Sequence, residues 1–391
     1  MNLSPSERFR VLAAIIAAIT IMAFALSSSI PLVSLMLEKR GVGNDVIGLM
    51  GAIPALTFLF FSPVIPKLAE RIGAGILLWA ALIGCSLSIL LLAYTEALIT
   101  WFILRLFIGL CMAILFLISE TWLNQVALEK TRGRTVALYV AFMTSGFAAG
   151  PLLINQVGTD GNLGFIIAAC IVAGGGFFFA LIGENYPKLQ GHSSFSIVSF
   201  FRLAPLISAA ALYVAFFDGS IMTLLPVYGV KVGMAAEVAV LMTSVLLAGN
   251  ILLQVPIGWL ADHFGRIKVI FICSAIGLAG ACSLPWLIET KYILWPVLVI
   301  WGGAVVGSYT LALVIMGQRF KNAELVTANA AAGVLWGVGS LIGPAAAGYS
   351  MEIYEPHGMP VTFIAVSVAF LVIAYVELHK DKIRRVAELK G

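Results

Sequence analysis

Two ionisable side chains lie deep inside long apolar stretches of this sequence, Arg105 in residues 98–126 and Asp218 in residues 203–229. A charged side chain at the centre of a membrane helix costs about 2.5–3.5 kcal/mol on insertion scales, so a buried charge needs a reason. A carboxylate that is shielded from water and close to an arginine can take up and release a proton. We therefore expect Arg105 and Asp218 to bind a substrate or to couple its movement to protons.

Each of these residues also has a purely structural interpretation. Arg105 could cap carbonyl groups of a neighbouring helix, and Asp218 could bond to Ser220 or to backbone groups as a packing device. A helix rises 1.5 Å per residue. If both stretches are membrane helices, Arg105 lies ~12 Å beyond the start of its helix and Asp218 ~16 Å before the end of its helix. Both depths are measured from the same, outer side of the membrane. The two depths differ by less than one helical turn, so we expect both side chains to face one cavity.

Further charges gather at the opposite ends of the predicted helices. Glu120 lies ~22 Å beyond Arg105 along the same helix, close to the positions at which arginines emerge from the apolar stretches. We interpret this group as a salt-bridge network that closes one end of the cavity and must break for that end to open. Its predicted members are Glu70, Arg71, Glu120, Arg132, Arg134, Asp262 and Arg266.

The stretches that position these residues identify the class of protein. Hydrophobic residues make up 61% of the 391 residues and charged residues only 11%, against about 45–50% and about 25% in soluble domains. Such a chain must cross the bilayer as helices or as a closed barrel, and its long unbroken apolar runs have the length of helices. We predict an all-α membrane protein. Its twelve expected transmembrane helices are 9–37, 46–66, 74–94, 98–126, 134–156, 162–182, 203–229, 236–260, 267–288, 292–317, 323–350 and 360–379.

The sequence repeats itself at an offset close to half its length. The segment 66–73 returns as 258–265, offset by 192 positions, with a carboxylate at the same place. Two further sets of residues recur at nearly the same offset. Gly146, Gly150 and Pro151 recur as Gly339, Gly343 and Pro344. Trp101 and Gly109 recur as Trp295 and Gly303. We predict two pseudo-symmetric six-helix bundles that superpose by a twofold axis along the membrane normal, as in secondary transporters built from parallel repeats.

The polar segments suggest the boundary and the orientation. The longest polar stretch, 184–202, is predicted to be a cytoplasmic linker between an N-terminal bundle, 1–183, and a C-terminal bundle, 203–391. With the N-terminus inside, 18 of the 23 Lys and Arg residues lie on cytoplasmic segments and four lie outside, in agreement with the positive-inside rule. We expect both termini in the cytoplasm, a first span that is retained rather than cleaved, and a basic tail after His379 along the inner membrane surface.

Several other functions are disfavoured. The five cysteines all lie in apolar runs without a CxxC pair, so we expect neither disulfides nor a metal site. The chain has no phosphate-binding GxxxxGK[ST] motif and no visible nucleophile–base pair, which argues against an ATPase or another enzyme and against a cofactor. The net charge of +4 follows the inside bias and does not indicate nucleic-acid binding.

The motifs between the predicted helices resemble those of the major facilitator superfamily over essentially the whole chain. The segment 258–268 is similar to the signature between spans 8 and 9 of that family, and the first-half copy departs from it at Pro66, Glu70 and Ala74. Arg105-x-x-x-Gly109 resembles a second motif, and Gly146-x-x-x-Gly150-Pro151 resembles a motif of its antiporters. Ser119-Glu120-Thr121 followed by Arg132-Gly133-Arg134 resembles the YcaD-like branch, which is related to some bacterial riboflavin importers.

This resemblance implies alternating-access transport of a small organic solute across the bacterial inner membrane, coupled to protons, by a monomer. It also implies a cavity lined by spans 1, 4, 7 and 10, and its polar and aromatic candidates are Ser28, Tyr213, Asn250, Gln254, Trp301 and Tyr309. Riboflavin-like uptake is the specific function that we expect. Proton-driven efflux of lipophilic compounds is the first alternative, and a membrane scaffold or sensor that transports nothing is the second.

Overall fold

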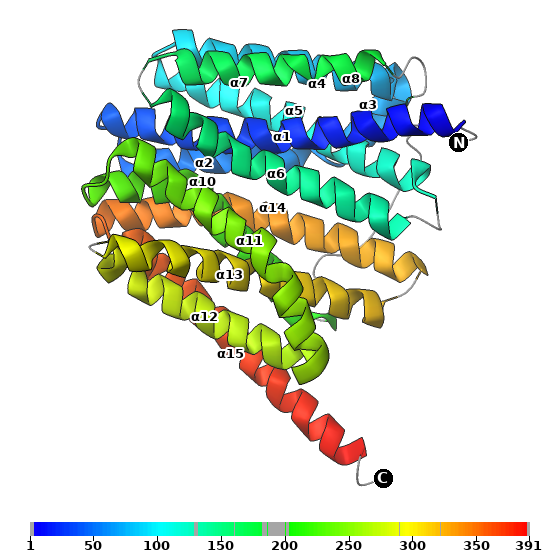
Figure 1. Ribbon diagram of the computed structural model, residues 1–391, viewed down its shortest axis with the longest axis vertical. Helices are drawn as coiled ribbons and strands as arrows, with labels where there is room; N and C mark the ends of the chain where they lie inside the picture. Colours follow the sequence, from blue (N-terminus) through cyan, green and yellow to red (C-terminus); the bar gives the residue numbers. More distant parts are fainter. Residues whose placement is uncertain are drawn as a thin grey trace. The chain divides into compact units, whose positions relative to one another are not determined.

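The computed structural model consists of helices (Figure 1), and its described residues contain no strand. The described residues are 4–128, 132–159, 161–181, 186, 200, 203–288, 290–320 and 322–388. Twelve helices within them are long and apolar enough to span a membrane. The prediction of an all-α protein with twelve transmembrane helices is therefore confirmed.

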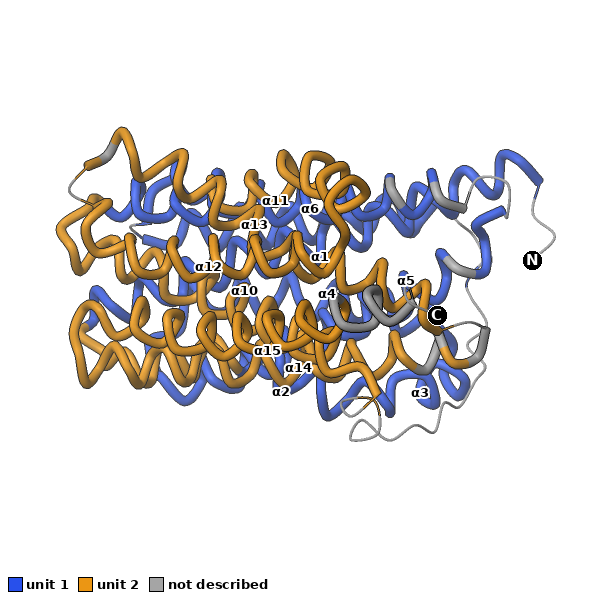
Figure 2. Tube along the Cα trace, turned by 90° about the horizontal axis from the view of Figure 1, so that it is seen from below, with its two compact units in different colours: residues 1–40, 53–192, 236–244 blue, residues 41–52, 193–235, 245–391 orange. Residues whose placement is uncertain are grey.

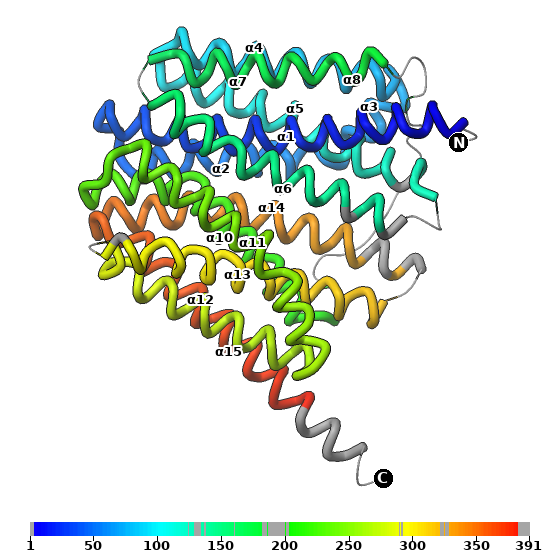
Figure 3. Tube along the Cα trace, viewed as in Figure 1, coloured from blue at the N-terminus to red at the C-terminus, as the bar shows by residue number. Residues whose placement is uncertain are grey.

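Of the helices that the described residues contain, eight come from the first half of the chain. They are α1 (Pro5–Lys39), α2 (Asn44–Phe61), α3 (Ile65–Ile72), α4 (Ala74–Tyr94), α5 (Leu98–Val126), α6 (Arg132–Val157), α7 (Leu163–Gly174) and α8 (Gly176–Ala180). Six come from the second half, and they are α10 (Pro205–Lys231), α11 (Ala236–Phe264), α12 (Arg266–Leu287), α13 (Lys291–Arg319), α14 (Asn322–Ile353) and α15 (Gly358–Glu388). The chain can be followed by colour in Figure 3.

The chain divides into two compact units (Figure 2), and two short segments are exchanged between them. Unit 1 consists of residues 1–40, 53–192 and 236–244, and unit 2 of residues 41–52, 193–235 and 245–391. The start of α2 thus belongs to unit 2, and the start of α11 belongs to unit 1. The sequence did not predict this exchange. Of the predicted linker 184–202, only Tyr186 and Phe200 are among the described residues.

Each unit is built around a pair of closely packed helices. In unit 1, α1 packs along α6, and in unit 2, α10 packs along α14. Glycines make both contacts possible, because a Cβ on Gly150 would lie 2.5 Å from the backbone nitrogen of Ser28, and one on Gly343 would lie 2.9 Å from the Cα of Phe216. Both Gly-x-x-x-Gly pairs are therefore close helix contacts, in line with the use of small residues at membrane helix interfaces.

The glycine that ends the repeated segment has the same backbone conformation in both copies. Gly73 has φ 92° and ψ 137° and directly precedes α4, and Gly265 has φ 90° and ψ 136° and directly precedes α12. A positive φ of this size is accessible to glycine and strained for other residues. The two glycines are 192 positions apart, which agrees with the offset of the repeat.

The structure differs from the sequence prediction in three local features. Residues 65–72 form the short helix α3 within a predicted loop, and the sixth span is divided into α7 and α8 at Gly175. A Cβ on Gly175 would overlap the side chain of Ile21 in α1, so the close approach of α1 coincides with the bend. At the C-terminus, α15 continues as one helix through Glu388, beyond the predicted end of the last span.

Candidate functional site

Arg105 is fully buried in the structure. Its side chain is 0% exposed, although it lies only two turns from the start of α5. Nη1 donates a hydrogen bond of 3.3 Å to the hydroxyl of Ser29 on α1, and the buried Nε has no partner among the described residues. The Cys85 thiol on α4 lies close enough to interact with the guanidinium electrostatically. A guanidinium carries five N–H donors, so this cation is poorly satisfied within its own unit.

A close contact between α2 and α5 lies next to Arg105. A Cβ on Gly109, one turn further along α5, would lie 2.7 Å from the Cα of Pro54. The hydroxyl of Thr57 donates to the carbonyl of Leu106 at 3.2 Å across the same contact. The spacing Arg105-x-x-x-Gly109 therefore places a charge beside a position where two helices meet at backbone distance.

Asp218 lies within α10 and is half-buried. Its carboxylate makes no hydrogen bond or ion pair with the described residues of unit 2. The hydroxyl of Ser220 donates instead to the carbonyl of Phe216 at 2.7 Å. The neighbouring Gly219 packs against α14, where a Cβ would lie 3.1 Å from the carbonyl oxygen of Ser340. Asp218 thus lies where α10 and α14 are in close contact, with its carboxylate available for a partner.

The cavity-lining candidates fall into two groups in the structure. Ser28, Tyr213 and Trp301 are buried. The hydroxyl of Tyr213 shares a hydrogen bond of 3.0 Å with Ser367, and its ring stacks on Phe370 at 4.6 Å. Trp301 donates from Nε1 to the carbonyl of Gly277 at 3.0 Å. In this conformation these side chains take part in helix packing.

The other three candidates keep part of their surface exposed. Gln254 donates to Asn250 on the same face of α11 at 2.7 Å, as their spacing predicts. The ring of Tyr309 on α13 lies 5.1 Å from that of Trp336 on α14, and both side chains are half-buried. These residues offer hydrogen-bonding groups and an aromatic surface in unit 2.

The predicted gate residues lie at the expected helix ends, and the structure brings one pair together. Asp262 and Arg266 approach to 3.6 Å, and Arg266 also donates to Gln318 at 2.8 Å. In unit 1, Glu120 lies on α5 within electrostatic range of Tyr139. The side chains of Glu70, Arg71, Glu120 and Arg134 are exposed. The side chain of Arg132 is outside the described residues, so the predicted network around Glu120 stays a prediction.

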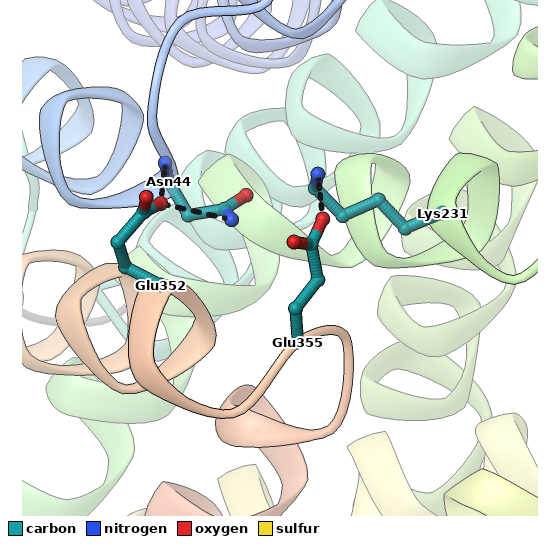
Figure 4. A network of polar contacts seen from close by, with 4 residues as sticks. All are labelled: Asn44, Lys231, Glu352 and Glu355. Atoms are coloured by element: carbon teal, nitrogen blue, oxygen red, sulfur yellow. Dashed lines mark hydrogen bonds and ion pairs between the residues drawn. The ribbon is translucent and has the colours of Figure 1, made fainter.

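Sequence reasoning missed a polar network at the other end of unit 2 (Figure 4). Glu352, at the end of α14, accepts hydrogen bonds from the backbone N–H and the side-chain amide of Asn44 at 2.7 and 3.2 Å. Lys231 forms an ion pair with Glu355 nearby. The signal in the sequence was weak, because Asn44 is 308 positions from Glu352 and both lie beside short polar loops.

Among the residues that the structure describes, no group of three His, Cys, Asp or Glu side chains gathers closely enough to hold a metal ion. What the site residues offer is a buried cation, a carboxylate without a partner in its unit, and a half-buried aromatic pair. Such groups can bind and release a solute or a proton.

Comparison with known proteins places these features in a family. The sequence matches the Major Facilitator Superfamily over residues 14–344 and again over residues 210–391. It is 28% identical to the uncharacterized MFS-type transporter YfkF of Bacillus subtilis (strain 168) over 351 residues, which are 86% of this chain and 88% of YfkF. It is 27% identical to the uncharacterized MFS-type transporter YcaD of Salmonella paratyphi B over 280 residues, which are 70% of this chain and 71% of YcaD.

The fold is similar to that of solved transporters. A mutant of the nucleoside transporter NupG superposes with a TM-score of 0.76 at 14% identity, over 93% of this chain and 99% of NupG. A bacterial homolog of the human lysosomal transporter Spinster, in an inward-facing and unoccupied conformation, superposes with a TM-score of 0.75 at 14% identity, over 95% of this chain and 96% of the homolog. With the helices and motifs described above, these matches show that the chain is a multi-pass membrane transporter rather than an enzyme and belongs to the Major Facilitator Superfamily.

Proposed function

We propose that this transporter moves a small organic solute across the bacterial inner membrane by alternating access, and that protons drive it. The observation that carries the proposal is the enclosure of Arg105, whose guanidinium is fully buried and makes one hydrogen bond, to a neutral hydroxyl. A buried charge without a counter-charge is strongly unfavourable. Charges retained inside membrane helices are functional by default, and the missing partner of Arg105 is then a carboxylate or a solute.

Asp218 supplies the carboxylate in this proposal. While Asp218 is ionised it neutralises Arg105, and when it takes up a proton it frees Arg105 for an electronegative group of the solute. Binding of a proton and binding of the solute are then linked, because each changes the affinity for the other by the same factor. Support comes from Asp218 itself, whose carboxylate has no partner within the described part of unit 2.

The proposed solute carries a flat ring system, and a riboflavin-like vitamin taken up into the cell is the specific candidate. The half-buried pair of Tyr309 and Trp336 offers an aromatic surface of the kind on which such rings stack. The hydrogen-bonding groups of Asn250 and Gln254 on α11 would orient the polar edge of the ring. Ser28, Tyr213 and Trp301 complete the proposed lining.

The remaining parts of the proposal concern the cycle and its setting. Both termini lie in the cytoplasm, the linker 184–202 joins bundles 1–183 and 203–391, and the protein works as a monomer. The cytoplasmic gate is closed by ion pairs among Glu70, Arg71, Glu120, Arg132, Arg134, Asp262 and Arg266. Replacing Glu120 by Gln is expected to favour the inward-open state by about 1 kcal/mol, which labelling of inner-cavity cysteines would measure.

The test begins with a thermal-shift screen of the purified protein against flavins, nucleosides, dyes and drugs, because a bound ligand stabilises by mass action. Accumulation of the hit is then measured in proteoliposomes with an imposed proton gradient. Asp218→Asn is expected to abolish proton-driven accumulation and to spare binding, whereas Arg105→Ala should lose both. Glu96→Gln, which changes an exposed carboxylate at a helix end, is the matched control. Wild-type accumulation in Asp218→Asn contradicts the coupling role.

Proton-driven efflux of lipophilic compounds is the second candidate, and a specific feature favours it. Gly150-Pro151 lies inside α6 at its contact with α1, as in the antiporter motif that it resembles. Efflux predicts accumulation in inside-out vesicles when the lumen is acidic, whereas uptake predicts it in right-side-out vesicles. Movement of no compound in either vesicle would favour the scaffold or sensor interpretation instead.

A further inference from the structure

A tyrosine of the predicted linker is held by three helices of unit 1. The side chain of Tyr186 is half-buried, and its ring lies 5.7 Å from that of Trp122 near the end of α5. Its hydroxyl accepts a hydrogen bond of 3.2 Å from Nε1 of Trp79 near the start of α4. The same hydroxyl donates one of 3.5 Å to the carbonyl oxygen of Phe179 near the end of α8. All four residues belong to unit 1, so both functions of the phenol hydroxyl are used within that unit.

The ring of Tyr186 fits because α4 begins with small residues. The start of α4 lies beside α8 at one end of unit 1 (Figure 1), and its first two residues are Ala74 and Gly75. A Cβ on Gly75 would lie 2.8 Å from two carbon atoms of the Tyr186 ring. A side chain at position 75 and a ring at position 186 therefore exclude each other. The small residues also leave a groove of about 740 Å³ that Tyr186 borders.

The second copy of the repeat shows what this position becomes when no ring occupies it. Gly265 has the same backbone conformation as Gly73, but the residues that follow it are Arg, Ile and Lys at 266–268. Ile267 is 192 positions after Gly75, so the second copy carries a β-branched side chain where the first has none. The departure of the first copy from the repeat thus creates the space for Tyr186.

The polar groups of the site favour a phenol over a purely apolar ring. A buried indole N–H or carbonyl group that loses its partner is costly, so tryptophan N–H groups are usually paired. Here the N–H of Trp79 and the carbonyl of Phe179 meet at one hydroxyl. Trp79 and Phe179 also pack edge to face, with ring centroids 5.9 Å apart. An aromatic ring that carries a hydroxyl at its far end satisfies both groups, whereas an apolar side chain satisfies neither.

We propose that unit 1 carries a phenol-binding pocket whose ligand is Tyr186 of the chain's own linker. The pocket consists of Trp79, Trp122, Phe179 and the backbone at Gly75. Binding of the ring fixes the point at which the linker leaves unit 1. Removing the ring leaves a pocket that accepts a free phenol of the same size. The inference depends neither on the transported solute nor on proton coupling.

The first test removes the ligand and supplies it again as a small molecule. Thermal unfolding of the purified full chain is measured in detergent for the parent and for Tyr186→Ala, with and without p-cresol, which is the free side chain of tyrosine. Tyr186→Ala is expected to lower Tm by about 2–5 °C. Saturating p-cresol should raise the Tm of this variant by about 1–3 °C relative to the parent in the same solution. Toluene, which has the same shape without the hydroxyl, should raise it less.

The second test fills the pocket with the residue of the other copy. Gly75→Ile should lower Tm by about as much as Tyr186→Ala, because the new side chain displaces the ring. The double variant should be no less stable than either single variant, since both changes remove the same contact. It should also show no response to p-cresol. The control is Gly174→Ile in the Tyr186→Ala background, because a Cβ on Gly174 would meet nothing within 4 Å; this variant should keep the p-cresol response.

Four results would overturn the inference. They are an equal effect of p-cresol on the parent and on Tyr186→Ala, additive losses of Tm for Gly75→Ile and Tyr186→Ala, a p-cresol response that persists in the double variant, and stabilisation by toluene as large as that by p-cresol. The last result would mean that Tyr186 fills an apolar hole without selection for a phenol. None of these measurements uses a transported solute, so a failed transport assay leaves them unchanged.

Discussion

Helix α14 contains one glycine that is in close contact with α10, Gly343, and one with free space around its Cα, Gly333. The two positions therefore allow a matched prediction. A Cβ on Gly343 would lie 2.8 Å from the Ser220 hydroxyl and 2.9 Å from the Cα of Phe216, and it would overlap the carbonyl oxygen of Phe216. A Cβ on Gly333, ten residues earlier in α14, would meet nothing within 4 Å. The same substitution, glycine to alanine, should therefore have opposite effects at the two positions.

The magnitudes follow from crowding and from helix propensity. Backbone atoms cannot rotate away, so Gly343→Ala must separate α10 from α14, and such overpacking costs about 1–3 kcal/mol. At either position, alanine stabilises the helix by about 0.5–1 kcal/mol relative to glycine because of its higher helix propensity. Gly343→Ala should therefore destabilise by about 1 kcal/mol, and Gly333→Ala should stabilise by about 0.5–1 kcal/mol.

The assay is thermal unfolding of the purified protein in detergent, with all variants measured at one scan rate. The entropy of unfolding is ~2.1 cal/mol/K per residue. For a chain of this length, each kcal/mol lost or gained in the free energy of unfolding therefore shifts Tm by about 1–2 °C. Gly343→Ala should thus lower Tm by about 1–2 °C, and Gly333→Ala should raise it by about 1 °C. Equal shifts in the two variants, or an increase for Gly343→Ala, would show that backbone contact does not hold unit 2 together.

The other predictions test unit 1, the buried charge, an aromatic bond and the gate. Gly150→Ala should destabilise as much as Gly343→Ala, because it meets α1 in the pseudo-equivalent contact; a Tm equal to that of the parent would contradict this. Arg105→Met should abolish uptake while leaving Tm unchanged or higher, since an apolar side chain replaces an unsatisfied charge; a fall of several degrees would mean that Arg105 is a structural cap. Trp301→Phe should lower stability by about 1 kcal/mol through loss of the bond to the Gly277 carbonyl, measured as Tm. Asp262→Asn should change stability by less than about 0.5 kcal/mol, because the pair with Arg266 is exposed, and should still increase labelling of inner-cavity cysteines.

The sequence was sufficient for the features that depend on apolar length and on the repeat. A run of about 20 apolar residues has few alternatives to a membrane helix, so all twelve spans could be predicted. The repeat of Gly146 and Gly150 as Gly339 and Gly343 could be predicted as well, and small residues at that spacing share one helix face. Both predictions rest on local patterns that do not depend on distant partners.

The features that were missed depend on partners far away in the chain. The cap of Asn44 by Glu352 joins two polar loop residues that have no distinguishing local pattern. The role of Tyr213 was equally hidden, since an aromatic residue on a membrane helix can face a cavity or pack in the core. Its partners Ser367 and Phe370 lie on α15. Composition gives the environment of such residues, and only tertiary structure gives their contacts.

The exchange of the starts of α2 and α11 between the units also constrains the order in which the protein can fold during synthesis. α2 is among the first segments to leave the ribosome, yet its cap at Glu352 is 308 residues later. At about 5–20 residues per second, roughly 15–60 s separate the two. During that time the N–H groups of the first turn of α2, and the backbone beside Gly48, have no native partner on α14. During synthesis, water at the membrane surface can satisfy these N–H groups, and α2 reaches its native contact only when α14 has been made.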